Sequence, residues 1–199
     1  MEVRAYMNNK LCSLIYYFIK NLPNLNKTEI VKLTYFVDYS FYKYFNKDIT
    51  GITYKHYKHG PFSKSVYDCI DKMKQENIIK QKENTSLNKQ RRYYSYLIVE
   101  NYDISKYLVK QELDIIEFVI DEFGKLGYEK LTELSYKTEP MEKAKKNDIL
   151  NFDLINKSIM NKIIEVRKEK GSLNNYFGKP LQSQENEDFL QYQYKIMSN

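Results

Sequence analysis

The sequence predicts a single α+β domain that is mainly helical, with about six helices and a small antiparallel β-hairpin. Apolar side chains recur at helical spacing in both halves of the chain. Between residues 52 and 98 the period shortens to two, which is the period of a strand. The 199 residues, 42% of them hydrophobic, suffice for one packed core and argue against disorder.

Two helices are expected first. Residues 3–20 carry apolar side chains at helical spacing, and Pro23 ends that segment. Asn26 and Glu29 are capping residues placed before a second apolar run, which reaches residue 45. The sequence therefore predicts an amphipathic helix that begins after Asn26.

The middle of the chain predicts strands around a third helix. Residues 52–59 alternate in a strand-like pattern, and Gly60-Pro61 is expected to break that strand. A third helix should begin at Pro61 or Ser63 and end near Glu76. Residues 78–82 and 92–98 read as two strands of a hairpin, with polar turn residues between them.

The second half returns to helical spacing. Helices are expected at 111–126, around 128–136, after Thr138, and at 152–169, where Gly171 marks the end. No period follows Gly171. We therefore expect residues 1–170 to form the domain and residues 171–199 to form a C-terminal extension, specific to a partner.

Composition narrows the protein class. The longest apolar stretches are too short to cross a bilayer, and the N-terminus does not read as a secretory signal. Cys12 and Cys69 match no zinc or redox spacing, so we expect buried free thiols and no disulfide scaffold. These features predict a cytoplasmic protein with no membrane partner.

The positive charge is confined to one segment. The net charge is +6, and residues 53–94 hold ten Lys or Arg against four Asp or Glu, so that segment carries the whole excess. Such asymmetry indicates an acidic partner or phosphates. The 20 tyrosines are not counted as a binding signal, because AT-rich codons favour Tyr, Lys, Asn and Ile.

The same segment leaves DNA binding open as an alternative. A third helix followed by a hairpin with Lys89, Arg91 and Arg92 has the outline of a winged helix. Acidic residues on that helix, such as Asp68 and Asp71, would repel the phosphates. The basic hairpin residues also fit a solvated face that discourages aggregation. Nucleic acid is therefore the less favoured partner.

Catalytic and metal-binding patterns are missing from the sequence. It has no nucleophile elbow, no phosphate-binding glycine loop and no paired carboxylate and histidine. His56 and His59 are three residues apart in an expected strand, so their side chains should point to opposite faces. We therefore expect no metal site, no cofactor and no enzymatic activity.

Three segments in fixed order carry a resemblance to a known family. They are residues 29–49 with KLTYF, residues 52–73 with Gly-Pro and then Val-Tyr, and residues 113–144 with the Thr-Glu-Pro element. Together they resemble the Panacea domain, or SocA-like antitoxin domain, over about residues 8–146. The family's tryptophans are replaced here by Tyr54 or Tyr57 and by Met141.

The resemblance implies a non-enzymatic antitoxin. Family members bind a toxin directly, often one encoded by an adjacent gene, and some deliver it to a protease. A prophage or mobile-element protein that binds a host factor through the same scaffold is a further alternative. Gly60-Pro61 is expected to serve mainly as a structural turn. It is also included, with nearby aromatic and basic residues, in a predicted partner-binding set: Tyr54, Tyr57, His59, Gly60, Pro61, Arg91, Arg92 and Tyr93.

Overall fold

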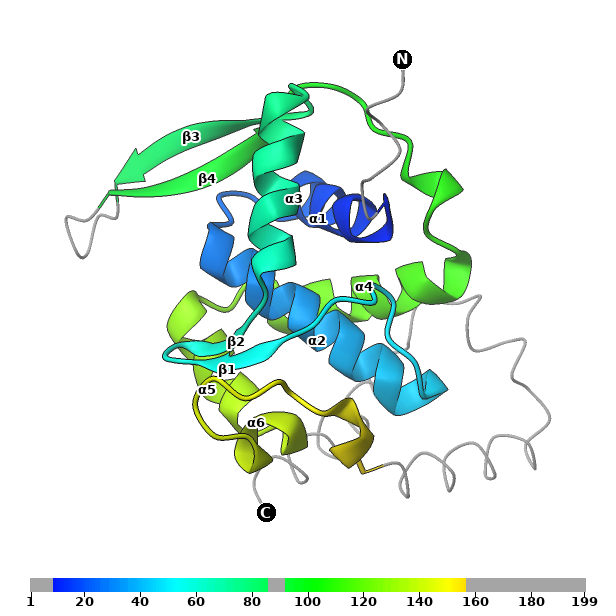
Figure 1. Ribbon diagram of the computed structural model, residues 1–199. Helices are drawn as coiled ribbons and strands as arrows, with labels where there is room; N and C mark the ends of the chain where they lie inside the picture. The colour runs from blue at the N-terminus through cyan, green and yellow to red at the C-terminus, as the bar shows by residue number, and fades with distance from the viewer. Residues whose placement is uncertain (1–8, 86–91, 157–199) are drawn as a thin grey trace.

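A central buried helix organises the structure. The computed structural model describes residues 9–85 and 92–156. Helix α2 (Lys27–Phe45) runs through the middle of the molecule and packs against α1, α3, α4, α5 and β2 (Figure 1). The fold is mainly helical α+β, as the sequence predicts.

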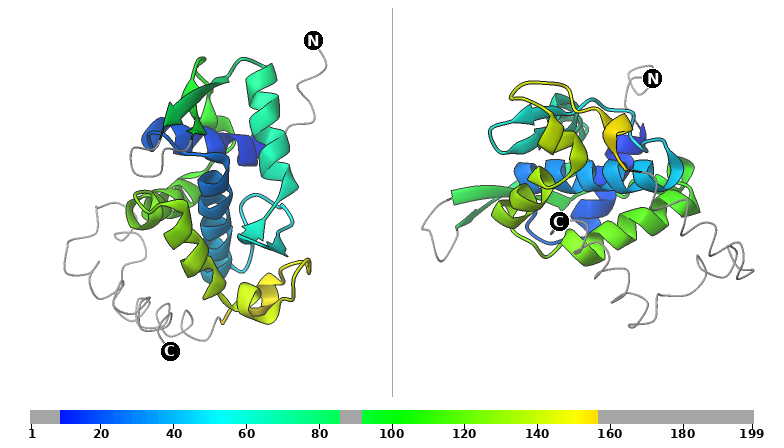
Figure 2. Two further views of the ribbon diagram at one scale, coloured as in Figure 1. Left: turned by 90° about the vertical axis from the view of Figure 1, so that its left-hand side faces the viewer. Right: turned by 90° about the horizontal axis from the view of Figure 1, so that it is seen from below.

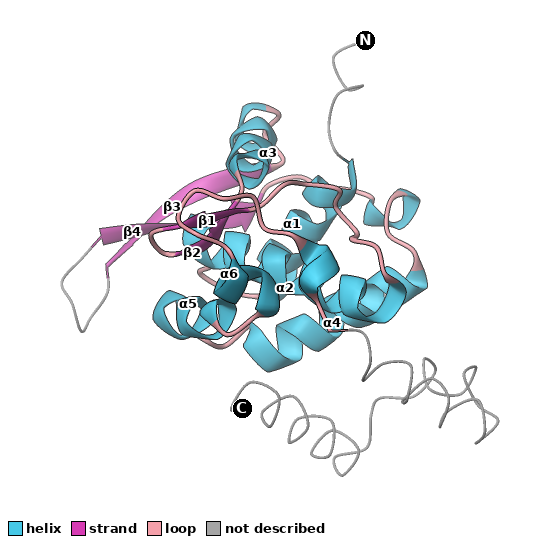
Figure 3. Cartoon of the chain, turned by 60° about the horizontal axis from the view of Figure 1, so that its bottom comes forward, coloured by secondary structure: helices cyan, strands magenta, loops and turns pink. Residues whose placement is uncertain are grey.

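The remaining elements surround α2. The helices are α1 (Asn9–Asn21), α3 (Lys64–Gln75), α4 (Lys110–Phe123), α5 (Tyr128–Tyr136) and α6 (Glu139–Lys143), with short 3-10 helices η2 (Ile104–Lys106) and η3 (Phe152–Leu154). The strands are β1 (Lys55–Tyr57), β2 (Gly60–Phe62), β3 (Ile79–Thr85) and β4 (Arg92–Ile98). They form two separate antiparallel hairpins, which Figure 3 shows to one side of most of the helices.

The caps of α2 confirm the sequence prediction. The Asn26 side chain accepts from the Glu29 backbone N–H, and the Glu29 carboxylate accepts from the Asn26 N–H, both at 3.0 Å. Asn46 ends the helix in the left-handed region at φ 56°. Thirteen of the 19 residues are buried, so α2 is enclosed on most of its circumference.

The first hairpin corrects one expectation. Gly60-Pro61 was expected to break the strand, but it begins β2, which pairs with β1 from Tyr57↔Gly60 to Lys55↔Phe62. Gly60 has a φ of +85°, which lets the chain reverse within the short turn after β1. On the other side of β1, the His56 N–H donates to the Asp148 carbonyl at 2.9 Å.

The second hairpin confirms the prediction. The strands β3 and β4 pair from Ile79↔Ile98 to Thr85↔Arg92. The hairpin extends away from the helices (Figures 1 and 2). Its base lies in the core at Ile79, which is 1% exposed, and Tyr96 of β4 is buried there as well, at 5% exposure.

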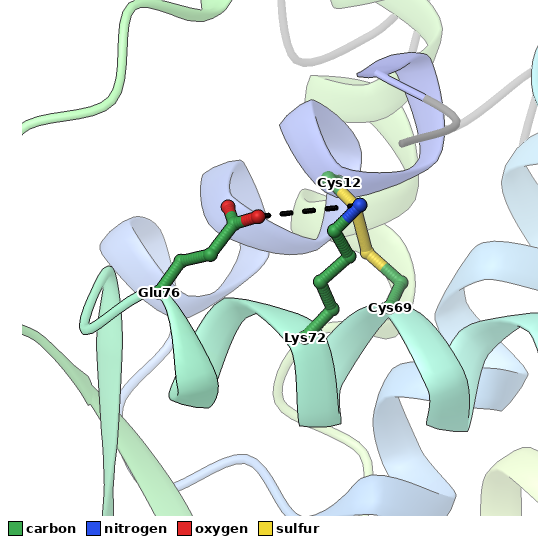
Figure 4. Close-up of a disulfide and its surroundings, with 4 residues drawn as sticks. All are labelled: Cys12, Cys69, Lys72 and Glu76. Atoms are coloured by element: carbon green, nitrogen blue, oxygen red, sulfur yellow. Dashed lines mark ion pairs between the residues drawn. A yellow bond between two sulfur atoms is a disulfide. The ribbon is translucent and has the colours of Figure 1, made fainter. Parts of the chain in front are cut away.

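Cys12 and Cys69 are not the free thiols expected from the sequence. Helices α1 and α3 pack together and bring the two Cα atoms to 6.1 Å, where the cysteines form a disulfide. Figure 4 shows this bond between the two helices, beside the ion pair of Lys72 and Glu76. The expectation was wrong because 57 residues separate the cysteines, and helix packing alone makes them neighbours.

The prediction of a helix at residues 152–169 was also wrong at its start. Instead of a long helix from residue 152, the chain forms η3, and Ile155 is extended at φ −64°, ψ 124°. The Phe152 ring stacks on Tyr54, with ring centroids 5.9 Å apart, which fixes this short turn against the core. The rest of that predicted helix, the extension at 171–199 and residues 3–8 of the first helix lie outside the described residues. In the part that the structure describes, no helix is long and apolar enough to cross a membrane.

Candidate partner-binding site

The three segments that carry the resemblance meet on α2. The Lys32 ammonium group donates to the Pro61 carbonyl at 2.7 Å, which ties α2 to the Gly-Pro turn. The Tyr35 and Thr138 hydroxyls hydrogen-bond at 2.6 Å, which ties the same helix to the start of α6. One face of α2 therefore holds the other two segments in place.

Tyr39 strengthens the second of these links. Its hydroxyl donates to the Glu139 carboxylate at 2.6 Å. The Lys43 ammonium group lies 5.4 Å from the centre of the Tyr39 ring. Burial lowers the pKa of Lys43, and the charge of Glu139 opposes that shift.

The Gly-Pro turn fits closely against α5. A Cβ atom on Gly60 would lie 2.7 Å from the Ser135 hydroxyl oxygen and 3.2 Å from the Lys32 nitrogen. The Tyr136 hydroxyl donates to the Tyr57 carbonyl at 3.1 Å and accepts from the Gly60 N–H at 3.3 Å. Glycine at position 60 is therefore required both by its backbone angle and by the space available.

Asp38 fixes the chain between α2 and β1. Its carboxylate accepts from the backbone N–H groups of Ile49 and Thr50 at 2.9 and 3.0 Å, and from the Tyr54 hydroxyl at 2.7 Å. The Thr50 hydroxyl donates to it as well. Asp38 is fully buried, and every donor comes from the segment that leads into β1.

Burial shifts the two central charged groups on α2. It raises the pKa of the Asp38 carboxyl to about 6, although the hydrogen bonds from Thr50 and Tyr54 act in the opposite direction. Burial also lowers the pKa of the Lys32 ammonium group to about 7. Perturbed pKa values can mark a reactive site. Here both groups hold loops in place, and the residues around them are packed.

The predicted set divides between the core and the two hairpins. Tyr54 is only 2% exposed and belongs to the Asp38 network, and Gly60 and Pro61 are buried against α2 and α5. Tyr57, by contrast, is 50% exposed, and His59 is exposed beside it. In the first hairpin, Tyr57 and His59 therefore lie on the surface, while the Gly-Pro pair holds the turn.

The basic members of the set lie on the second hairpin. Arg92 is exposed and forms an ion pair with Glu83 at 3.2 Å. Tyr93 is partly exposed next to it, and Arg91 lies outside the described residues. The structure does not bring the set together, because its members lie on or next to two separate hairpins, one at each end of α3 (Figure 1).

A pocket of about 440 Å³ lies between the second hairpin and the start of α2. Its lining is rich in tyrosine: Asn26, Lys27, Thr28, Gln81, Tyr93, Tyr94, Tyr96 and Tyr128. This pocket was not predicted from the sequence, because the abundance of tyrosine was attributed to AT-rich codons. The signal that could have revealed it is local, since three of the tyrosines fall within one seven-residue strand.

The histidines do not form a metal site within the described ranges. No group of three or more His, Cys, Asp or Glu side chains there is placed to hold an ion. The His56 ring packs edge-on against Tyr136, with ring centroids 5.5 Å apart. Lys32, Asp38, Tyr35 and Tyr39 were also missed as key residues, although polar side chains inside a strongly apolar helix are the signal for such buried contacts.

Comparison with known proteins matches the sequence to one family. Neither the curated proteins nor the solved structures contain a significant match to the chain. The family model described as "Antitoxin SocA-like, Panacea domain" matches residues 30–141, which is more than half of the chain. That range includes α2 from Ile30 onward, both hairpins and the contacts of α2 with the Gly-Pro turn and with the start of α6. The chain therefore belongs to the SocA-like antitoxin, Panacea domain family.

Proposed function

We propose that this protein is the antitoxin of a toxin–antitoxin pair and neutralises its toxin by direct, non-catalytic binding. The observation that carries the proposal is the family match over residues 30–141. An antitoxin of this kind needs affinity and coverage of a partner, and these require exposed anchor residues on a stable scaffold.

The distribution of the motif residues supports a scaffold with a separate binding surface. Lys32, Asp38 and Gly60 are buried and hold segments of the fold together. The exposed aromatic side chains Tyr57 and Tyr94, at 50% and 49% exposure, lie on the two hairpins. Tyrosine is enriched among residues that anchor protein interfaces. We therefore place toxin binding on the hairpins.

The charge pattern of α3 argues against the DNA-binding alternative. A winged-helix reading would place α3 in the major groove. Each of its lysines pairs with an acidic residue of the helix or of its C-cap: Lys64 with Asp68, Lys74 with Asp71, and Lys72 with the C-cap residue Glu76. Together with its C-cap residue Glu76, the helix carries no net charge for attraction to phosphates, so a protein partner is favoured.

The test is co-expression with each neighbouring open reading frame, with growth and co-purification as readouts. A neighbour that stops growth alone, and becomes harmless and co-purifies with this chain, supports the proposal. Tyr57→Ala should weaken both growth rescue and co-purification. The control is Val109→Ala, which should change neither; Val109 is 59% exposed but lies outside both hairpins. If every neighbour is harmless by itself, the proposal is wrong.

Delivery of the toxin to a protease is distinguished from blocking by the amount of toxin in the cell. Blocking leaves the toxin level unchanged while growth recovers. Delivery lowers the toxin level, and that loss disappears in a protease-deficient host. We propose blocking as the mechanism, because a buried interface alone is sufficient for it.

A further inference from the structure

Strand β3 has an edge that no described residue covers. The strand pairs with β4 on one side only. Lys80, Gln81, Lys82 and Glu83 are all exposed, whereas the centre of β4 is buried at Ser95 and Tyr96. Alternate residues of an antiparallel strand direct their N–H and C=O groups away from the paired neighbour. Outside the β3–β4 ladder, no backbone hydrogen bond to residues 79–85 occurs within the described ranges.

The two faces of this edge differ in chemistry. Lys80 and Lys82 lie on one face because side chains alternate along a strand. Neither lysine forms an ion pair with a described residue, unlike Arg92, which pairs with Glu83. The strand residues of the hairpin carry three basic side chains against one acidic, a net charge of +2.

Gln81 lies on the opposite face and lines the tyrosine pocket. Its partner across the hairpin is Tyr96, and Tyr94 lies opposite Glu83 on the same face. Tyr96 is 5% exposed, whereas Tyr94 is 49% exposed. Gln81 is the β3 residue of this pocket, and Tyr93, Tyr94 and Tyr96 of β4 supply aromatic walls next to it.

The charges along β3 determine which kind of strand can pair with its free edge. A second copy of the chain pairing through β3 would bring Lys80 and Lys82 close to the same lysines, and like charges across a strand pair are destabilising. An extended segment with acidic side chains at alternate positions would meet opposite charges instead. Its intervening side chain would point to the pocket face.

We propose that an extended acidic segment of the partner protein adds to β3 as a third, edge strand, with two acidic side chains beside Lys80 and Lys82 and an apolar side chain between them over the tyrosine pocket. Main-chain hydrogen bonds supply affinity in this mode, and the alternating side chains supply specificity. The identity of that partner as a toxin rests on the function proposed above.

The chain has no tryptophan, so a tryptophan-containing peptide can be followed by its own fluorescence. The probe is acetyl-Thr-Glu-Trp-Glu-Thr-amide, added to the full chain at low ionic strength. It should bind roughly tenfold or more tightly than the same peptide with Gln in place of Glu, and its affinity should fall with salt. Two versions N-methylated at alternate backbone nitrogens should differ, because only one set of N–H groups faces β3.

Charge reversal locates the contact on the protein. Lys80→Glu with Lys82→Glu should abolish binding of the acidic probe and create binding of the corresponding peptide with Lys in place of Glu. The matched control is Lys55→Glu with Lys58→Glu, two exposed lysines of the first hairpin, which should leave binding unchanged. Tyr94→Ala should weaken binding about tenfold, whereas Leu97→Ala, a 40% exposed residue on the lysine face, should have a smaller effect.

The outcomes separate this inference from the proposed function. Equal binding of the Glu and Gln peptides, equal binding of both N-methylated versions, or absence of binding at millimolar peptide overturns the inference. Binding of a random-sequence DNA duplex that depends on Lys80 and Lys82, without peptide binding, also overturns it, as does dimerisation lost on the same substitutions. If the peptide binds as expected but no neighbouring gene is toxic, the edge-strand site stands and the antitoxin proposal fails.

Discussion

Reduction of the disulfide between Cys12 and Cys69 should destabilise the fold without changing it. The bond links two residues separated by 57 positions. In the chain-entropy model, a cross-link that closes a loop of this length contributes about 4 kcal/mol, between the values for 15-residue and 100-residue loops. Both cysteines are buried, so the reduced thiols should stay packed between α1 and α3 as small apolar side chains.

The expected loss of stability is large enough for a thermal scan. For a chain of this size, 1 kcal/mol corresponds to about 2–4 °C in melting temperature, so reduction should lower the Tm by roughly 8–16 °C. The assay is circular dichroism of the same air-oxidised preparation with and without a phosphine reductant. The helical signal at low temperature should be unchanged.

Thiol counting makes this prediction refutable. Under denaturing conditions, maleimide should label no cysteine before reduction and both cysteines after it. A double Cys12→Ala, Cys69→Ala variant is the control, because its melting temperature should not respond to the reductant. If both cysteines are labelled without reduction, or if reduction is complete and the Tm is unchanged, the assignment of this bond as a stabilising link is wrong.

Three further predictions concern the buried contacts of α2 and the Gly-Pro turn. Burial raises the pKa of Asp38 from 3.8 to about 6, so the folded state holds this proton more tightly than the unfolded state does. The free energy of unfolding should therefore fall by up to about 3 kcal/mol as the pH rises from 3.8 to about 6. Urea titrations should show that Asp38→Asn removes this dependence on pH, whereas the control Glu83→Gln does not. Burial lowers the pKa of Lys32 from 10.5 to about 7, so the folded state binds that proton less tightly than the unfolded state does. The free energy of unfolding should therefore rise with pH between about 7 and 10.5. A rise of the same size in Lys32→Met would contradict the burial of this amine. Gly60→Ala should lower the free energy of unfolding, measured by chemical denaturation, by about 1–3 kcal/mol more than Gly51→Ala does. Both glycines have positive φ, but only a Cβ on Gly60 would collide, at 2.7 Å from the Ser135 hydroxyl oxygen. Equal losses of stability in the two variants would show that this close contact carries no energy.

The features that were predicted correctly have local causes. The cap at Asn26 and Glu29 and the helical spacing after it determine where α2 begins, and both signals lie within a few residues. The β3–β4 hairpin follows from two strand-like runs joined by polar turn residues. Such signals depend little on the rest of the fold, so the sequence alone suffices for them.

The features that were missed depend on distant segments. Tyr54 fits an alternating strand pattern, but its burial is decided by Asp38 on another element, which accepts its hydroxyl. The disulfide required the packing of α1 on α3, and the short turn at Phe152 required the ring of Tyr54. No local pattern contains this information, because each contact joins elements that tertiary packing brings together.

The contacts that close α2 also determine when this protein can fold during its synthesis. Tyr35 and Tyr39 hydrogen-bond to residues 103 and 100 positions later in the chain. At a synthesis rate of about 5–20 residues per second, these partners are synthesised roughly 5–20 s after α2. During that interval the tyrosine hydroxyls and the apolar face of α2 lack their native neighbours, and long-range contacts of this kind slow folding. We therefore expect the nascent chain to stay sensitive to proteolysis until α6 has left the ribosome.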